Sequence, residues 1–391
     1  MLESMFVPEA FDEEILAKAK QLRTRIDIPD ELDTIFFIAR FLRALDGDVE
    51  ITKLRIEEYL THRKCLEYGN MDPLAIFTKS LIGRDTFERF GISLLQPETT
   101  SKNVHVWIHK MVDTDLKEIM KVIPLSNVIH SYFMLQDLFG RYVAATEKRT
   151  GIQSSVCCVL DLDGFNISDF LNPLSAPVKL ARLVVQVWAE YFSENMGKLV
   201  IINPPALINI MWKISKWILD ARTQNRLIFM STGEDLLQHL EPQVVPVDYG
   251  GTRRDDTGFA NPATSCCQQP RLVSPSEYRE PDAIWKENGM SKPACKSYHV
   301  KGKSSVDIMR TTNESGLLIW QFTTGSDVQF EIVKKGDNEE HVWPKITITS
   351  LKLPEYGSVR VEKGEYLLRF TNPASTWLPV KVQCSVEIVP Q

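Results

Sequence analysis

The sequence has no excess of either charge sign and no long uninterrupted apolar run. Its 45 basic and 51 acidic residues give a formal net charge of -6, which excludes the strongly basic surface typical of nucleic-acid-binding proteins. The apolar run 207–219 is interrupted by Lys213 and Lys216. It is also too short for a membrane span, which needs about 20 residues. Acidic residues such as Glu9 and Asp12 stand where a secretory signal requires a basic start. We therefore expect a soluble, non-exported protein that binds no nucleic acid.

Cysteine motifs for metal or redox chemistry are also missing. The seven cysteines form no CxxC spacing, and four of them occur as the adjacent pairs Cys157–Cys158 and Cys266–Cys267. An odd number of cysteines in a chain without a visible export signal favours reduced thiols over a disulfide framework. The sequence therefore predicts a cytoplasmic protein.

Signatures of common enzymes are absent as well. The sequence contains no GxGxxG, GxSxG or HExxH motif. Gly302, Lys303 and Ser304 resemble the end of a phosphate-binding loop, but Ser297 stands where that loop requires glycine. We therefore predict a protein that is not an enzyme and that uses no cofactor. A hydrolase or oxidoreductase on an α/β sheet is the alternative with least support.

Two pairs of polar residues on expected strands have the spacing of candidate sites. His105 and His109 share one strand face, as do Asp161 and Asp163 near the end of another strand. The histidines lack His or Cys partners at ligand spacing, so we interpret them as solvated strand residues and predict no metal. The aspartates lack a nucleophile, so we favour capping of the turn at Gly164 over acid–base chemistry.

The residue pattern changes twice along the 391 residues, which exceed what one hydrophobic core usually organises. Residues 12–68 have helical spacing, with Gly47 expected as a C-terminal cap. After Thr99, short apolar runs alternate with helix-length segments at about 125–150, 173–195, 205–220 and 234–239. From about Tyr298, alternation such as Val380, Val382 and Cys384 predicts strands.

The predicted fold class is an α/β domain with a mostly parallel sheet, preceded by a helical module and followed by an all-β sandwich. The polar, proline-rich stretch before the last domain predicts a linker. The predicted domain boundaries are 1–85 for the helical module, 86–252 for the α/β domain, 253–282 for the linker and 283–391 for the sandwich.

The segment 205–220 is the most unusual feature, because apolar residues cover more than half of the expected helix circumference. Only Asn209, Lys213 and Lys216 form a polar strip. Periodicity alone favours a buried core helix. The functional alternative is a helix with sheet or ligand on one side and membrane on the other.

Several segments resemble the CRAL-TRIO family of lipid-binding proteins. The family's N-terminal helical region is similar to IARFLRALDGDVEITKLRIEEYLTHRK. The lipid-binding domain of its phosphatidylinositol transfer proteins is similar, in order and spacing, to VLDLDGF, YFSENMGKLVIINPPALINIMWKISKWILDARTQNRLIFM and VVPVDYGG. The GOLD domain, which follows in the group of supernatant protein factor and tocopherol-associated protein, is similar to GLLIWQFTTGSDVQFEI and GEYLLRFTNPASTW. These segments together cover nearly the whole chain.

The resemblance implies a hydrophobic cavity between sheet and helices, covered by a mobile gating helix that matches Pro205 to Leu219. One side of that helix would line the cavity and the other would meet the membrane. The implied gate or cavity residues are Leu207, Ile208, Ile210, Met211, Trp212, Ile214, Trp217, Ile218 and Leu219.

The resemblance also implies a site for a lipid headgroup. In members that bind phosphatidylinositol, the matching positions are Glu194, Thr223 and Arg226, where a guanidinium is suited to phosphate oxygens. That subfamily carries a basic pair where this chain has Leu45 and Asp46. The ligand is therefore left open between a phospholipid, a sterol precursor and a tocopherol-like molecule.

The implied function is binding of a hydrophobic lipid in a gated cavity and its transfer between membranes, or its presentation to partner proteins, without catalysis. The alternative is an adaptor or signalling protein, whose GOLD domain recruits partners while the lipid domain senses membrane state. The expected partners are the lipid, a transient membrane surface and a protein bound by the GOLD-like domain. The expected location is cytoplasmic and peripheral on membranes, with Golgi or endosomes as candidates.

Overall fold

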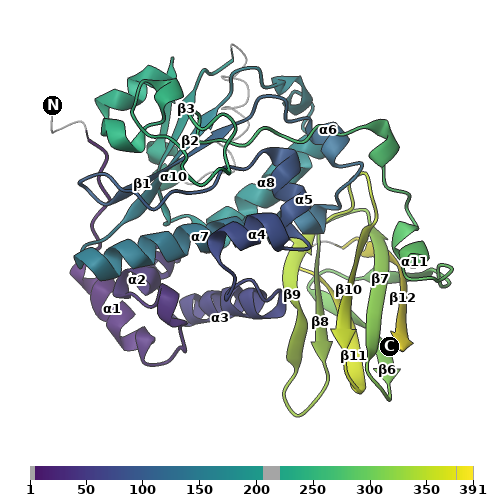
Figure 1. The fold of residues 1–391 in the computed structure, drawn as a ribbon. Helices are drawn as coiled ribbons and strands as arrows, with labels where there is room; N and C mark the ends of the chain where they lie inside the picture. The colour runs from purple at the N-terminus through teal and green to yellow at the C-terminus, as the bar shows by residue number, and fades with distance from the viewer. Residues whose placement is uncertain (1–4, 206–220, 376, 391) are drawn as a thin grey trace. The chain divides into compact units, whose positions relative to one another are not determined.

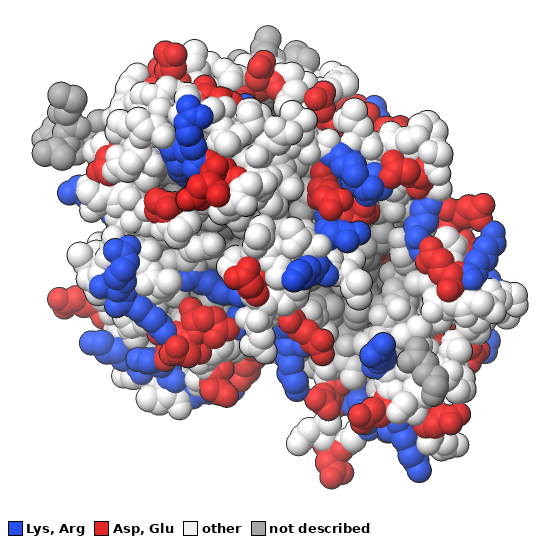
Figure 2. Space-filling model, viewed as in Figure 1, with Lys and Arg blue, Asp and Glu red and all other residues white. Residues whose placement is uncertain are grey.

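The structure is a computed structural model that describes residues 5–205, 221–375 and 377–390, apart from the side chains of 221–223. The chain forms two compact units. Unit 1 consists of Met1–Glu57, Asp72–Asp115 and Tyr132–Leu272, and unit 2 consists of Glu58–Met71, Leu116–Ser131 and Val273–Gln391. No helix among the described residues is long and apolar enough to cross a membrane. On the face drawn in Figure 2, acidic and basic side chains are interspersed.

The N-terminal region is helical, as its spacing predicts. At the start of α2 the Thr34 hydroxyl accepts a hydrogen bond from the Phe37 N–H at 3.0 Å. Beyond its end, the Gly47 N–H donates to the Leu42 carbonyl at 2.7 Å, with a positive φ at Gly47. The expected cap at Gly47 is therefore confirmed. The helices are α1 (Glu13–Arg23), η2 (Asp30–Leu32), α2 (Ile35–Ala44), α3 (Val49–Cys65), α4 (Pro73–Lys79) and α5 (Gly83–Phe90).

The centre of unit 1 is a four-stranded parallel sheet in the order β1-β2-β3-β4, which confirms the predicted α/β arrangement (Figure 1). The strands are β1 (Val104–Lys110), β2 (Ser155–Asp161), β3 (Met196–Ile202) and β4 (Leu227–Met230). The segments between them contain α6 (Leu116–Ile119), α7 (Leu125–Thr150), η3 (Ile167–Phe170), α8 (Ala176–Val187), η4 (Trp188–Phe192) and α10 (Ala221–Arg226). The expected helix at 173–195 begins later because Ser175 caps α8, and it ends in the π-helical turn η4.

One face of the sheet is covered by the C-terminal part of unit 1. Val106, Val159 and Val200 belong to a buried cluster that also contains Phe6 and Cys267. The covering turns are η5 (Gly233–Gln238), η6 (Pro242–Val244) and η7 (Val247–Tyr249).

Unit 1 continues to Leu272 and so includes most of the segment 253–282, whose composition predicts a linker. Arg253 donates to the Val106 carbonyl at 3.1 Å, and Cys267 is buried. Because few residues of this segment are apolar and they have no regular period, their packing leaves no signal in the sequence.

Most of unit 2 is an antiparallel β-sandwich, which confirms the prediction for the C-terminal region. One sheet has the order β10-β7-β12-β5 and the other has the order β6-β11-β8-β9. Trp320, Phe322, Phe330 and Phe370 fill the core between them. The strands are β5 (Lys296–Val300), β6 (Ser304–Thr312), β7 (Gly316–Thr324), β8 (Val328–Lys334), β9 (Glu340–Ile348), β10 (Glu355–Val361), β11 (Gly364–Asn372) and β12 (Val380–Pro390), preceded by η8 (Pro275–Glu277) and α11 (Ala283–Glu287).

Candidate functional site

The second face of the parallel sheet carries two cross-strand rows of mostly apolar side chains, which we call the floor. Because side chains alternate along a strand, these residues lie opposite the buried cluster on the first face. The strand register places Trp107, Cys158, Leu199 and Leu227 in one row and His109, Leu160, Ile201 and Phe229 in the other.

Burial of the floor decreases from β1 toward the edge strand β4. Trp107 is buried and lies 5.4 Å, centroid to centroid, from Phe139 of α7. Leu199 and Ile201 are half-buried, and Phe229 on β4 is 40% exposed. The described residues therefore leave apolar surface at the β3–β4 side of the sheet, where hydrocarbon would be stabilised by about 0.8 kcal/mol per buried methylene.

A cluster of four charged residues lies where β3 and β4 begin, and we call it the edge cluster: Glu9, Arg43, Glu194 and Arg226. Glu194 precedes β3 by two residues and Arg226 directly precedes β4. The Glu194 carboxylate accepts from Arg43 Nε at 2.5 Å and from Arg226 at 3.0 Å, and all three side chains are largely buried. Arg226 also donates to the Glu9 carboxylate, which is 60% exposed, at 2.9 Å.

The electrostatics of the edge cluster are balanced, with two positive and two negative groups. Burial lowers the pKa of Arg43, and Glu194 offsets this only in part. Burial also lowers the pKa of Arg226, but the hydrogen bonds and charges of Glu194 and Glu9 outweigh it and the pKa rises. Arg226 additionally donates to the carbonyls of Ser193 at 3.1 Å and Met196 at 3.4 Å. A ligand anion that binds Arg226 would therefore have to replace one of its two carboxylate partners. Of these, Glu9 is exposed and Glu194 is buried.

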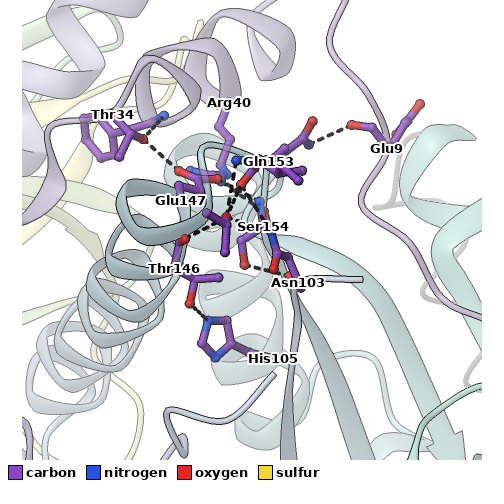
Figure 3. Close-up of polar contacts among 12 residues, drawn as sticks. Glu9, Thr34, Arg40, Asn103, His105, Thr146, Glu147, Gln153 and Ser154 are labelled. Carbon is purple, nitrogen blue, oxygen red and sulfur yellow. Dashed lines mark hydrogen bonds and ion pairs between the residues drawn. The ribbon is translucent and has the colours of Figure 1, made fainter. Parts of the chain in front are cut away.

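A buried polar network joins α2 to the residues that directly precede β1 and β2 (Figure 3). Arg40 pairs with Glu147 of α7 and donates to the Ser154 carbonyl at 3.0 Å. Glu147 also accepts from the Thr34 hydroxyl at 2.8 Å and the Ser154 N–H at 3.0 Å. Ser154 in turn donates to the Asn103 carbonyl at 2.7 Å, just before β1. Arg40 and Arg43, one turn apart on α2, thus contact the starts of adjacent strands.

The structure brings together two of the three headgroup candidates, Glu194 and Arg226, whereas the side chain of Thr223 lies outside the described residues. Leu45 and Asp46 follow the end of α2, and Asp46 has a positive φ. All the gate and cavity candidates also lie outside the described residues: Leu207, Ile208, Ile210, Met211, Trp212, Ile214, Trp217, Ile218 and Leu219.

Arg43 and Glu9 belong to the edge cluster but were not among the residues predicted from the sequence. One signal was available for Arg43, because Arg40 and Arg43 interrupt the otherwise apolar run IFFIARFLRA, and arginine on a buried helix face requires a buried partner. No comparable signal marks Glu9, which reaches Arg226 from 217 residues away in the chain.

The interpretation of His105 and His109 as solvated residues is wrong, because both are buried. His105 contacts the Thr146 hydroxyl at 3.0 Å, and burial lowers the pKa of each histidine to about 4. Asp161 accepts from the Asp163 N–H at 3.0 Å, which confirms its local capping role, and also from Tyr249 at 2.8 Å. Within the described ranges, no group of acidic, His and Cys residues has the arrangement of a metal site.

Known proteins share this sequence pattern. Residues 92–251 match the CRAL/TRIO domain family. A CRAL-TRIO domain-containing protein of Caenorhabditis elegans is 24% identical over 374 residues, which cover 93% of this chain and 91% of that protein. The SEC14 cytosolic factor of Kluyveromyces lactis is 25% identical over 254 residues, which cover 62% of this chain and 80% of that protein. The crystal structure of Sfh5 aligns with 69% of this chain and 96% of its own, at 14% identity and a TM-score of 0.46.

Proposed function

Because residues 92–251 form a CRAL/TRIO domain, we propose that this protein binds a hydrophobic lipid in that domain and transfers or presents it without catalysis. The observation that carries the proposal is the floor, whose apolar side chains become more exposed toward β4. Its half-buried members are those that a lipid chain would cover. One relative, the SEC14 cytosolic factor of Kluyveromyces lactis, is named as a cytosolic protein, which fits the proposed location.

In this proposal the segment 205–219 covers the lipid as a gate. An enclosed chain of about sixteen carbons would lose on the order of 10 kcal/mol on release into water. Exchange then requires contact with a membrane, which solvates the chain while the gate is open. Binding and release need no bond to be made or broken, and we propose no catalytic residue and no cofactor.

The edge cluster is the proposed headgroup site, with Glu194, Thr223 and Arg226 as its candidates. A phosphate displaces Glu9 from Arg226, and the guanidinium then pairs with phosphate oxygens. Because the cluster is charge-balanced, a less polar ligand can also be accommodated. A phospholipid, a sterol precursor and a tocopherol-like molecule are the ligand classes to be tested.

Lipid extraction from the gently purified full chain, followed by mass spectrometry, tests the proposal. We expect stoichiometric lipid in the wild type and a strong loss in Phe229→Asp, which places a charge on the floor. Leu272→Asp is the matched control, since Leu272 is 67% exposed and lies in unit 1 outside the floor. No lipid in the wild type, under conditions that load the SEC14 cytosolic factor, would refute lipid binding.

The alternative function, an adaptor whose GOLD-like domain recruits partners, has one supporting observation. The β-sandwich at 283–391 contains its own aromatic core. If the adaptor role holds, deleting the residues after about 280 should abolish the protein's localisation to its membrane. Lipid exchange by the remaining chain should be preserved. Since unit 2 also includes 58–71 and 116–131, this deletion removes their packing partners. Surface substitutions on the sandwich are therefore the cleaner test.

We also propose the limits of the parts that precede the sandwich. They are 1–85 for the helical module, 86–252 for the lipid-binding domain and 253–282 for the linker. The proposed location is cytoplasmic and peripheral on membranes, with Golgi or endosomal membranes as the candidates to examine by microscopy. The proposed partners are the lipid, a membrane surface and a protein bound by the GOLD-like sandwich.

A further inference from the structure

Trp377 is fully exposed, with a relative exposure of 102%, and the adjacent Leu378 is 80% exposed. They lie in the connection between β11 and β12. Large aromatic side chains are usually highly buried in soluble proteins. The other tryptophans that the structure describes are all buried: Trp107, Trp188, Trp285, Trp320 and Trp343. Trp377 is therefore unlike the rest of the described tryptophans.

Exposed lysines lie beside this connection. The turn between β5 and β6 carries Lys301 and Lys303, and the Lys303 N–H donates to the carbonyls of Asn372 at 2.9 Å and Ala374 at 3.2 Å. These bonds tie the two connections together. Lys381, at the start of β12, is exposed and pairs in register with His299 of β5. Among the described residues, no carboxylate lies within ion-pair distance of these three lysines.

The segments that connect the strands differ in charge between the two ends of the sandwich. The connections at the Trp377 end are 301–303, 325–327, 349–354 and 373–379, and they contain three lysines and one aspartate. The connections at the opposite end are 313–315, 335–339 and 362–363, and they contain two lysines and four acidic residues. The exposed tryptophan therefore lies among the connecting segments with a positive excess, which attract an anionic surface.

We propose that this end of the sandwich docks on an anionic membrane surface through Trp377, Leu378, Lys301, Lys303 and Lys381, which we call the tip. An indole ring favours the boundary between headgroups and hydrocarbon. Lysine ammonium groups are attracted to anionic headgroups while their alkyl stems lie along the boundary. The tip gives the chain a membrane contact separate from the CRAL/TRIO domain, beyond the proposed lipid binding.

The surroundings of Trp377 favour a membrane over a protein partner. Aromatic anchors of protein interfaces lie among other contacts that exclude water, and lysine is depleted there. Here the two apolar side chains stand beside exposed lysines, which matches an interfacial membrane anchor. Each lysine near an anionic surface strengthens binding by roughly fivefold. Two apolar side chains and three lysines give reversible attachment, as exchange between membranes requires.

Vesicle co-sedimentation of the full chain tests the tip. We expect binding to phosphatidylcholine vesicles that contain phosphatidylserine, much weaker binding to phosphatidylcholine alone, and a decrease with added salt. The double variant Trp377→Ser, Leu378→Ser should lower the partition coefficient by about tenfold or more. The double variant Lys301→Glu, Lys303→Glu should lower it by at least about 25-fold.

Two matched controls lie on the same sandwich. Met309→Ser removes another exposed apolar side chain, from β6, and Lys363→Glu reverses a lysine at the opposite end. Both should bind as the wild type does. Equal binding of tip variants and wild type, equal binding to both vesicle types, or no wild-type binding would each overturn the proposal. Lipid loading of the tip variants should be unchanged, which separates this proposal from the lipid-binding function.

Discussion

Arg226, which directly precedes β4, forms an ion pair with Glu194, two residues before β3, at an N–O distance of 3.0 Å. Both side chains are largely buried, whereas the second carboxylate on Arg226, that of Glu9, is 60% exposed. Arg226 thus has one buried partner and one exposed partner, and we propose that a ligand anion displaces the exposed one. This difference leads to opposite expectations for substitutions at Arg226 and Glu9.

Arg226→Ala should weaken loading of phosphatidylinositol by about tenfold to a hundredfold and affect phosphatidylcholine less, because it removes charge-assisted hydrogen bonds to the phosphate. Glu9→Gln should strengthen phosphatidylinositol loading, because it frees the outer side of the guanidinium. Exchange of labelled lipids into the purified chain measures both. Equal losses for the two lipids in Arg226→Ala would indicate a folding defect or another site.

The Arg40–Glu147 pair should contribute strongly to stability. Its side chains are 3% and 1% exposed, so Glu147→Gln leaves a buried guanidinium without its counter-charge and should lower the free energy of unfolding by about 3 kcal/mol or more. Glu57→Gln is the matched control, because Glu57 pairs with Lys53 on the surface of α3. It should change stability by less than about 0.5 kcal/mol. Urea titration followed by circular dichroism measures both, and equal effects would contradict the assignment.

The predictable parts of this protein are those with local or periodic causes. Strand alternation, the helical spacing of α2 and the Gly47 cap each depend on a few neighbouring residues, and the structure confirms them. The family segments predicted a CRAL-TRIO domain at 86–252, and the CRAL/TRIO domain family matches residues 92–251. Periodicity alone predicted only the α/β pattern of this region.

The parts that were missed depend on contacts distant in sequence. Glu9 and Arg226 are 217 residues apart, and the burial of His109 follows from the packing around β1, which its own strand pattern does not reveal. The half-buried floor appears only when the register of four strands is known. Taken singly in the sequence, residues such as Glu9, Arg226 and His109 look like ordinary surface positions.

Glu355 should make unit 2 less stable as pH rises from about 4.5 to about 7. Its carboxyl is buried and accepts from the N–H groups of Leu125 at 3.3 Å and Ser126 at 2.9 Å, and burial raises its pKa to about 7. The folded pKa lies above the unfolded value, so the stabilising contribution is complete below about pH 4.5 and is lost as pH rises to about 7.

Glu355→Gln removes this titration. The free energy of unfolding of the variant, minus that of the wild type, should therefore increase between pH 4.5 and pH 8 by up to about 3 kcal/mol. Denaturant titrations over this range measure the difference. Glu387→Gln removes an exposed carboxyl from β12 and is the matched control. A difference for Glu355→Gln that does not vary with pH would contradict the assignment.

The buried pair His62 and His130 should have the opposite pH dependence. His62 Nε2 lies 3.0 Å from His130 Nδ1, and its Nδ1 lies 2.9 Å from the Tyr68 hydroxyl, all within unit 2. Burial lowers the pKa of both imidazoles, that of His130 to about 3. Because the folded values are depressed, the unfolded chain binds more protons below about pH 6.5, and stability is lost as pH falls.

His130→Gln removes one of these titrating groups, so the variant should lose less stability than the wild type between pH 7 and pH 5, by about 2 kcal/mol. Tyr68→Phe is the control, because it removes the hydroxyl next to His62 without removing an imidazole. It should lower stability by about 1 kcal/mol at both pH values and leave the slope unchanged. A group that is equally protonated in the folded and unfolded states adds no pH dependence to stability. If the stability of His130→Gln therefore changes with pH as that of the wild type does, His130 does not stay neutral in the folded protein.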